Sequence, residues 1–241
     1  MNAANIHRPT LLLAATWPEA QYVARALGVT TQASQIVTPD WLLVTGGMGT
    51  HRVVAALHRA VRQKQVGRVI QFGFAGGLDP AFAPGHIETF ISLAEPSGRM
   101  ITLENIVPRV LAKEEQPPEG PRLLSVPYVI YRPADKQRLH KYHRACMVDM
   151  ESFAVAQACA QLNLPYRLVR AVTDPADMGL PYGIDTWLDF DGNIRKGRVI
   201  RHLLFNPRSL GVLRQLSHNS QIAGQAMAQQ VLDSMQQPWP Q

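Results

Sequence analysis

The sequence contains little cysteine and no apolar run long enough to cross a membrane. Two cysteines among 241 residues, Cys146 and Cys159, exclude a disulfide framework and are typical of a reducing compartment. The apolar run LLLAA at residues 11–15 is too short for a transmembrane helix, and no small-residue cleavage site follows it before Trp17. We therefore interpret this run as a first strand and expect a cytoplasmic protein.

Charged residues are also few, at 17%, and they are unbalanced in sign. The 24 Lys and Arg residues exceed the 18 Asp and Glu residues, which gives a formal net charge of +6, and the excess gathers at residues 132–144 and 195–202. Nucleic-acid binding is disfavoured, because aromatic residues among the basic ones are sparse and no binding motif is present. Weak contact with an anionic membrane surface and a solvated helix face are the remaining interpretations, and the second is the simpler.

Segments with strand-like and helix-like patterns alternate along the chain. Strands are expected at residues 11–15, 40–49, 66–78, 87–94, 122–131 and 166–174. Helices are expected at residues 18–28, 51–63, 151–162 and 203–235. This alternation predicts an α/β fold with a largely parallel sheet in a single domain, residues 1–241. The Pro-rich, charged residues 97–121 predict a loop or insertion, and residues 236–241 predict a frayed tail.

The junctions after the strands are the natural place for a binding site. Ligands of open α/β sheets bind beyond the carboxyl ends of the strands. The expected strands are followed by residues 16–19, 46–49, 73–77, 148–151 and 173–177. Carboxylates occur in three of these five junctions, which is more than strand ends need for solubility.

Asp174 is the first candidate. The following Pro175 disfavours the α region, so Asp174 should stay extended at the end of its strand. Its carboxyl group could then project into the crevice, where partial burial would raise its pKa and allow it to act as a general acid. A helix or turn cap formed by Asp174 or Asp177 explains the same spacing equally well.

Glu151 is the second candidate, within the segment VDMES that precedes an Ala-rich helix. A helix N-terminus favours negative groups in its first turn, and Asp149 is a suitable N-cap. From the spacing alone, helix initiation is the stronger interpretation of both residues, and a role for Glu151 at a substrate is the alternative.

Two glycine turns follow strands, GGMG at residues 46–49 and GFAGG at residues 73–77. Such glycines can allow a ligand to approach the backbone closely. Alternatively, they form only a tight turn without any ligand. Neither completes the GxGxxG pattern, which disfavours a dinucleotide-dependent oxidoreductase. A weak anion site is conceivable at Gly47, His51 and Arg52, although a solvated helix start is simpler. His140 and His143 form an HxxH pair without further ligands, so we expect no metal site.

Taken together, these segments resemble the purine nucleoside phosphorylase and nucleosidase superfamily, which includes methylthioadenosine/S-adenosylhomocysteine nucleosidase. FGFAGGLDPAFAPGHI at residues 72–87 is similar to its glycine turn, and VDMESFAVAQACAQLNLPYRLVRAVTDPAD at residues 148–177 to its second signature. AATWPEA at residues 14–20 lies where the family has its first catalytic-site glutamate. Two later segments further resemble the hopanoid-associated branch, whose members cleave adenine from adenosylhopane. They are RAVTDPADMGLP at residues 170–181 and DFDGNIRKGRVIRHLLFNP at residues 189–207.

The resemblance implies a three-layer α/β/α fold with a mostly parallel, mixed central sheet, and it assigns roles to particular residues. Asp174 matches the aspartate that protonates N7 of the purine, and Glu151 matches the glutamate that binds the ribose and faces its developing positive charge. Met150 matches the methionine that packs on the sugar. Glu19 matches the residue that positions the attacking water in nucleosidases.

The glycine turn and the segment that stacks on the base depart from the family pattern. Substrate contacts are implied for Phe74, Ala75 and Gly76, but Phe74 stands where many members have a Ser or Thr that helps to hold phosphate or water. SVPYVI at residues 125–130 replaces a polar segment. Stacking on the base would then fall to Tyr128, Val129 or Phe153. These apolar replacements would suit an apolar 5′ substituent.

We therefore expect an enzyme that releases adenine from a 5′-substituted adenosine, such as adenosylhopane, by phosphorolysis or by hydrolysis. The resemblance implies no cofactor and no metal, phosphate as the alternative co-substrate to water, and a homo-oligomer. A methylthioadenosine/S-adenosylhomocysteine nucleosidase and a non-catalytic nucleoside-binding protein are the alternatives. The presence of Glu19, Glu151 and Asp174 together favours catalysis, because binding alone requires no general acid.

Overall fold

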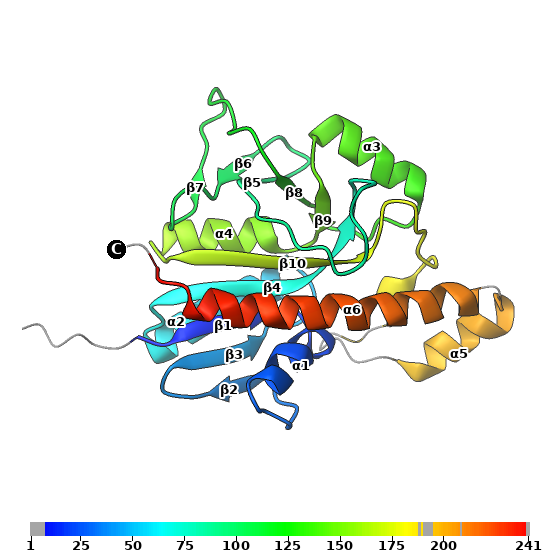
Figure 1. The fold of residues 1–241 in the computed structure, drawn as a ribbon, viewed down its shortest axis with the longest axis horizontal. Helices are drawn as coiled ribbons and strands as arrows, with labels where there is room; N and C mark the ends of the chain where they lie inside the picture. Colours follow the sequence, from blue (N-terminus) through cyan, green and yellow to red (C-terminus); the bar gives the residue numbers. More distant parts are fainter. Residues whose placement is uncertain (1–7, 188, 190–194, 208, 240–241) are drawn as a thin grey trace, which may run out of the picture.

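A mixed sheet with helices on both faces makes up the fold (Figure 1). The structure, a computed structural model, describes residues 8–187, 189, 195–207 and 209–239. In these ranges no helix has both the length and the apolar character that crossing a bilayer requires. The predicted α/β class is confirmed.

The strands run in the order β2-β3-β1-β4-β9-β8-β5-β6-β7, and β10 pairs with the long strand β4. Their bounds are Thr10–Ala14 (β1), Gln35–Val37 (β2), Trp41–Thr45 (β3), Arg68–Gly77 (β4), Ser92–Ala94 (β5), Met100–Thr102 (β6), Arg109–Val110 (β7), Arg122–Ser125 (β8), Met147–Asp149 (β9) and Tyr166–Asp174 (β10). Strands β1, β3, β4 and β10 pair in parallel, so their carboxyl ends meet at one edge. Strand β9 runs antiparallel to β4 and pairs with its last residues.

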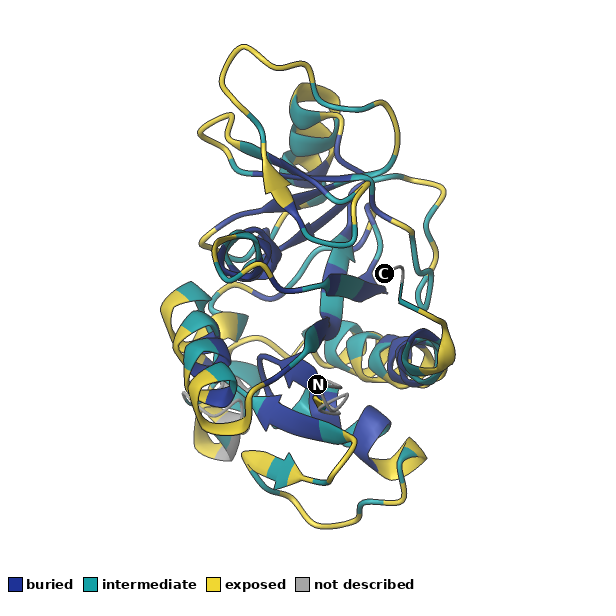
Figure 2. Cartoon of the chain, turned by 90° about the vertical axis from the view of Figure 1, so that its left-hand side faces the viewer, coloured by how far each residue is buried: buried dark blue, intermediate teal, exposed yellow. Residues whose placement is uncertain are grey.

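The helices form the outer layers. Their bounds are Trp17–Ala26 (α1), Thr50–Lys64 (α2), Pro133–His143 (α3), Ser152–Gln161 (α4), Lys196–Phe205 (α5) and Ser209–Gln236 (α6), with a 3-10 helix, η1, at Ile184–Trp187. Helices α1 and α6 cover one face of the sheet, and α2 and α4 cover the other. Their apolar sides are buried against the strands, whereas their outer sides and the loops are exposed (Figure 2).

Strand β1 illustrates why the central strands are continuously apolar. Leu11 and Leu13 pack into the core on the side of α2 and α4, while Leu12 and Ala14 pack on the side of α1 and α6. Because successive side chains of a strand point to opposite faces, a strand covered on both faces must be apolar at every position. All four residues are fully buried.

Two predictions about irregular segments need correction. Residues 97–121 are not simply a loop, because they contain β6 and β7, which extend the sheet beyond β5 by antiparallel pairing. The predicted frayed tail is held in place as far as Trp239, since the side chain of Arg167 donates hydrogen bonds to the carbonyls of Gln237 and Pro238 and lies over the Trp239 ring. The ends of the predicted domain, residues 1–7 and 240–241, lie outside the described residues.

Candidate active site

A cavity of about 690 Å³ opens where β1, β4, β9 and β10 end. It brings together residues that are far apart in the sequence, as the alignment of the strand ends leads one to expect. The predicted site residues that line it are Glu19, Phe74, Ala75, Gly76, Tyr128, Val129, Met150, Glu151 and Asp174.

Glu19 is fixed in the first turn of α1. One carboxylate oxygen, Oε2, accepts hydrogen bonds from the backbone N–H of Thr16 at 2.9 Å and from the Thr16 hydroxyl at 3.0 Å. The other, Oε1, accepts a hydrogen bond from the backbone N–H of Phe74 at 3.0 Å. Glu19 therefore caps its own helix and also links α1 to the last part of β4, where Phe74 lies. These contacts leave its carboxylate with little rotational freedom at the cavity wall.

Glu151 lies at the N-terminus of α4 and is 8% exposed. Its Oε1 atom accepts a hydrogen bond of 3.3 Å from the backbone N–H of Gly49, the N-cap residue of α2. Burial, and then the nearby negative charge of Asp149, raise the pKa of Glu151 to about 7, against the opposing effect of Arg170. The carboxyl group can thus change its charge close to neutral pH.

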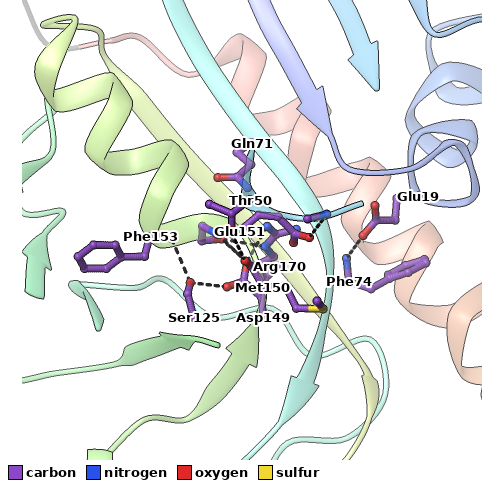
Figure 3. A network of polar contacts seen from close by, with 12 residues as sticks. Glu19, Thr50, Gln71, Phe74, Ser125, Asp149, Met150, Glu151, Phe153 and Arg170 are labelled. Carbon is purple, nitrogen blue, oxygen red and sulfur yellow. Dashed lines mark hydrogen bonds and ion pairs between the residues drawn. The ribbon is translucent and has the colours of Figure 1, made fainter. Parts of the chain in front are cut away.

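Asp149 and Arg170 form a buried ion pair behind Glu151 (Figure 3). Arg170 Nη2 lies 2.7 Å from Asp149 Oδ2, and both side chains are 1% exposed. Asp149 also accepts a hydrogen bond from the backbone N–H of Ser152, the first residue of α4, although the N-cap position is occupied by Glu151 and not by Asp149 as expected. Burial alone would lower the pKa of Arg170, but Asp149, Glu151 and Glu19 raise it, so the guanidinium stays charged among three carboxylates.

The close approach of these groups depends on glycine at position 73. In the register of β10 with β4, Arg170 lies opposite Gly73. A Cβ atom at Gly73 would fall 2.0 Å from Arg170 Nη1 and 2.7 Å from Glu19 Oε1, which are distances that atoms do not tolerate. Residues 73–77 were expected to form a turn but belong to β4, and Gly73 in this strand provides the space that Arg170 Nη1 and Glu19 Oε1 occupy.

Asp174 is the last residue of β10, as predicted, and its partner comes from α3. The ammonium of Lys136 donates a hydrogen bond of 2.7 Å to Asp174 Oδ2, and the hydroxyl of Thr173 donates one of 2.8 Å to Oδ1. Burial raises the pKa of Asp174, while Lys136 and Thr173 pull it in the opposite direction. The carboxyl group is therefore both desolvated and firmly oriented.

The cavity continues from these polar groups into an apolar arm. The arm is built from the segment after β10, η1, α5 and the start of α6, with Leu180, Ile184, Trp187, Val199, Leu213 and Leu216 on its wall. Trp187 is 6% exposed. One cavity thus combines four carboxyl groups, those of Glu19, Asp149, Glu151 and Asp174, with a long apolar surface.

Four of the predicted site residues do not line the cavity. The ring of Phe153, expected to stack on the base, is 1% exposed within the hydrophobic core under α4, and it points away from Glu151 (Figure 3). That prediction is wrong because Phe153 is on the buried side of its helix. His51 lines a separate small cleft between α2 and α4, and Gly47 and Arg52 lie outside the cavity wall. These three residues are therefore not part of the cavity, and the weak anion site stays a prediction.

Arg170 and Lys136 were not predicted as site residues, although each contacts a predicted carboxylate. A signal for Arg170 was present, because a charged residue in the apolar strand sequence LVRAV must find a buried partner. Lys136 gave no such signal, since it stands in a basic segment that also fits an exposed helix. Within the described residues, no group of three or more His, Cys, Asp or Glu side chains could hold a metal ion.

Comparisons with known proteins identify related sequences and folds. The model of the phosphorylase superfamily matches residues 11–88 and 110–195, more than half of the chain. The 5′-methylthioadenosine/S-adenosylhomocysteine nucleosidase of Geobacillus sp. (strain WCH70) is 24% identical over 157 residues, which cover 63% of each protein. The chain thus spans less than two thirds of the length of that relative.

Solved structures share the fold at low sequence identity. The futalosine hydrolase of Helicobacter pylori superimposes with a TM-score of 0.66 at 14% identity, covering 96% of this chain and 98% of the other. The methylthioadenosine/S-adenosylhomocysteine nucleosidase of the same organism, bound to an inhibitor, gives 0.65 at 14% identity, covering 95% and 97%. The corresponding Streptococcus pneumoniae nucleosidase, with a transition-state inhibitor, gives 0.62 at 16% identity, covering 94% and 98%. These likenesses support the three-layer architecture.

Proposed function

The chain belongs to the phosphorylase superfamily, and on that basis we propose that it is an enzyme that cleaves the N-glycosidic bond of an adenine nucleoside. The observation that carries the proposal is the convergence of Glu19, Glu151 and Asp174 on one cavity. Similar proteins are nucleosidases that act on methylthioadenosine and S-adenosylhomocysteine, and a futalosine hydrolase. A protein that only bound nucleosides would not need a buried acid beside two further carboxylates.

The three carboxyl groups suit the charges that develop when the bond breaks. An adenine anion is a poor leaving group, so it needs a proton, which Asp174 supplies to N7. The ribose becomes positively charged, and the Glu151 carboxylate stabilises it and accepts hydrogen bonds from its hydroxyl groups. Glu19, held by Thr16 and Phe74, orients the nucleophile and accepts its proton.

Water suits this cavity better than phosphate as the nucleophile. Glu19, Asp149 and Glu151 give the site a negative charge, and Arg170 is already paired with Asp149. A phosphate dianion would be repelled by these carboxylates unless a further cation met it, and His51 and Arg52 lie outside the cavity wall. We therefore propose hydrolysis, with phosphorolysis as the alternative.

The apolar arm favours a large apolar 5′ substituent. A cavity of about 690 Å³ is well within the size range of sites for drug-sized ligands. Leu180, Trp187 and Leu216 offer such a group a surface without unpaired charge. Adenosylhopane fits this description, and methylthioadenosine is the smaller alternative. Part of the segment that resembles the hopanoid-associated branch, residues 188 and 190–194, lies outside the described residues.

One assay tests the proposal. Pure protein is incubated with adenosine, methylthioadenosine or adenosylhopane, with and without phosphate, and free adenine and the sugar product are measured by mass spectrometry. We expect adenine without phosphate, and the free sugar rather than its 1-phosphate. If none of the three substrates releases adenine, the proposal that the protein is an enzyme of this kind is refuted. If adenine is released only when phosphate is present, the proposal of hydrolysis is refuted.

Two matched variants test the assigned acid. Asp174→Asn should lower kcat by about 100-fold or more, because an amide cannot donate the proton. Asp177→Asn makes the same change at an exposed position three residues further on and should leave kcat unchanged. Full activity in Asp174→Asn would show that another group is the acid.

A further inference from the structure

Lys136 is an unusual residue for the middle of a basic surface helix. Helix α3 carries several charged side chains, yet Lys136 is 0% exposed. Removing an ammonium from water costs several kcal/mol unless hydrogen-bond acceptors and an opposite charge compensate for it. A buried lysine therefore points to a specific interaction rather than to surface solubility.

The partners of Lys136 all belong to the end of β10 and the turn that follows. Its Nζ atom lies 2.7 Å from Asp174 Oδ2 and 2.8 Å from the Asp174 carbonyl oxygen. It also lies 2.9 Å from the carbonyl oxygen of Pro175 and 3.1 Å from that of Met178. An ammonium group has three N–H donors, so these four acceptors use its full capacity. Lys136 thus connects α3 to the strand end that carries the acid.

The surroundings of Asp174 contain few other polar groups. Thr173 on β10 donates to Oδ1, and Asn219 on α6 is neutral and binds the Thr173 carbonyl rather than the carboxyl group. On β4, the residue opposite Asp174 is Gly76, which has no side chain. Asp177, further along the turn, is exposed. The charge that acts on Asp174 at contact distance is that of Lys136.

We propose that Lys136 is a positioning residue for Asp174, holding its carboxyl group at the cavity wall and keeping it acidic enough to give its proton to the leaving base. This inference rests on the proposed function. Burial alone raises the pKa of Asp174, and a carboxyl group that binds its proton too tightly is a poor donor. The Lys136 ammonium opposes burial and lowers that pKa. A neutral side chain at this position would leave the effect of burial uncompensated.

Kinetics of Lys136→Met test the proposal. We expect kcat to fall by about 10- to 100-fold while KM changes by less than about threefold, because the acid is weaker but the binding groups remain. The alkaline limb of the rate profile should move up by about one pH unit, since Asp174 keeps its proton to higher pH. Lys141→Met, an exposed change on the same helix, should leave both unchanged. If Lys136→Met does not fold, Lys136→Gln is measured in its place.

A readout independent of turnover separates this inference from the proposed function. The infrared band of the protonated Asp174 carboxyl group, identified by its loss in Asp174→Asn, is followed with pH. It should persist to higher pH in the Lys136 variant than in the wild type. An inactive wild type with this shift would refute the proposed function alone. An unshifted band, or an unshifted alkaline limb in an active variant, would refute the role of Lys136.

Discussion

Glu151 shows how a single buried side chain can link stability to pH. Its pKa is raised to about 7, from an ordinary value of 4.5, first by burial and then by Asp149. The folded protein therefore binds a proton at this site more tightly than the unfolded chain does. As pH rises from below 4.5 through about 7, the unfolded chain loses its proton first and is favoured, so the contribution of Glu151 to stability is lost.

Glu151→Gln should remove this pH dependence. At pH 4, below the ordinary pKa of 4.5, the variant should have nearly the same free energy of unfolding as the wild type, because glutamine resembles the protonated acid. At pH 8 it should be more stable than the wild type by about 1–3 kcal/mol, since no charge is buried at this position. Urea unfolding at the two pH values measures the difference, and the variant should also lose activity.

Glu119→Gln provides the control, because Glu119 is exposed. Its difference from the wild type should be the same at both pH values. A pH-independent difference for Glu151→Gln as well would contradict the raised pKa of Glu151.

At the residue scale, the sequence predicts which residues line the cavity better than it predicts which side chains contact them. Asp174 is extended at the end of its strand because Pro175 follows it, and that local rule needs no tertiary information. The ion pair of Lys136 with Asp174 joins residues 38 positions apart, and no local pattern encodes it. The prediction for Phe153 was wrong because this residue, although only two positions after Glu151, lies on the buried side of α4.

The C-terminal segment shows the same limit at the scale of elements. Proline and glutamine after α6 indicate a frayed end, yet Arg167 on β10 donates hydrogen bonds to the carbonyls of Ser234, Gln237 and Pro238. Its guanidinium also lies 4.1 Å from the centre of the Trp239 ring. Strand β10 thus holds the segment after α6 as far as Trp239, and the composition of that segment contains no sign of it.

Arg167→Ala should therefore destabilise the protein. The variant loses three hydrogen bonds from a charged donor and the contact with Trp239, so we expect the free energy of unfolding to fall by about 1–3 kcal/mol. Urea unfolding followed by circular dichroism measures it. Arg62→Ala removes an exposed arginine of α2 and should change stability by less than about 0.5 kcal/mol. Equal effects of the two changes would mean that the tail is not held by Arg167.

The main elements, in contrast, follow from the sequence because each has a strong local pattern. The apolar run of β1 and the helical spacing of α2 predict their type, and the alternation of strands and helices predicts the parallel centre of the sheet. Strands β6 and β7 were missed because they are only three and two residues long. Strand β6 pairs with β5 and β7 pairs with β6, and a local sequence pattern contains no information about such pairing between segments.

At the scale of the whole molecule, the apolar arm and the net charge can be considered together. The formal net charge is +6, and the helix that borders the arm, α5, has exposed Arg198 and Arg201. Tyr182 and Phe205 are 83% and 79% exposed in the same region of the chain. Basic and aromatic residues together favour contact with an anionic bilayer, from which an apolar substrate could enter the arm.

The expected homo-oligomer stays a prediction, to be checked by light scattering.

We predict that the protein binds vesicles containing anionic lipid and that salt reverses the binding. Sedimentation with phosphatidylglycerol vesicles at low ionic strength should carry the protein into the pellet, whereas vesicles of neutral lipid should not, because the attraction is electrostatic. Arg201→Glu should weaken binding by about 30-fold, because reversing one charge is equivalent to removing two basic residues, each of which contributes about 1 kcal/mol to the attraction. Arg59→Glu makes the same change in net charge on α2, on the opposite side of the sheet from α6, and should weaken it less. Equal losses of vesicle binding in the two variants would mean that net charge, rather than the region around α5, attracts the protein to the bilayer. If the wild-type protein does not bind at low salt, the proposed contact with the bilayer is excluded.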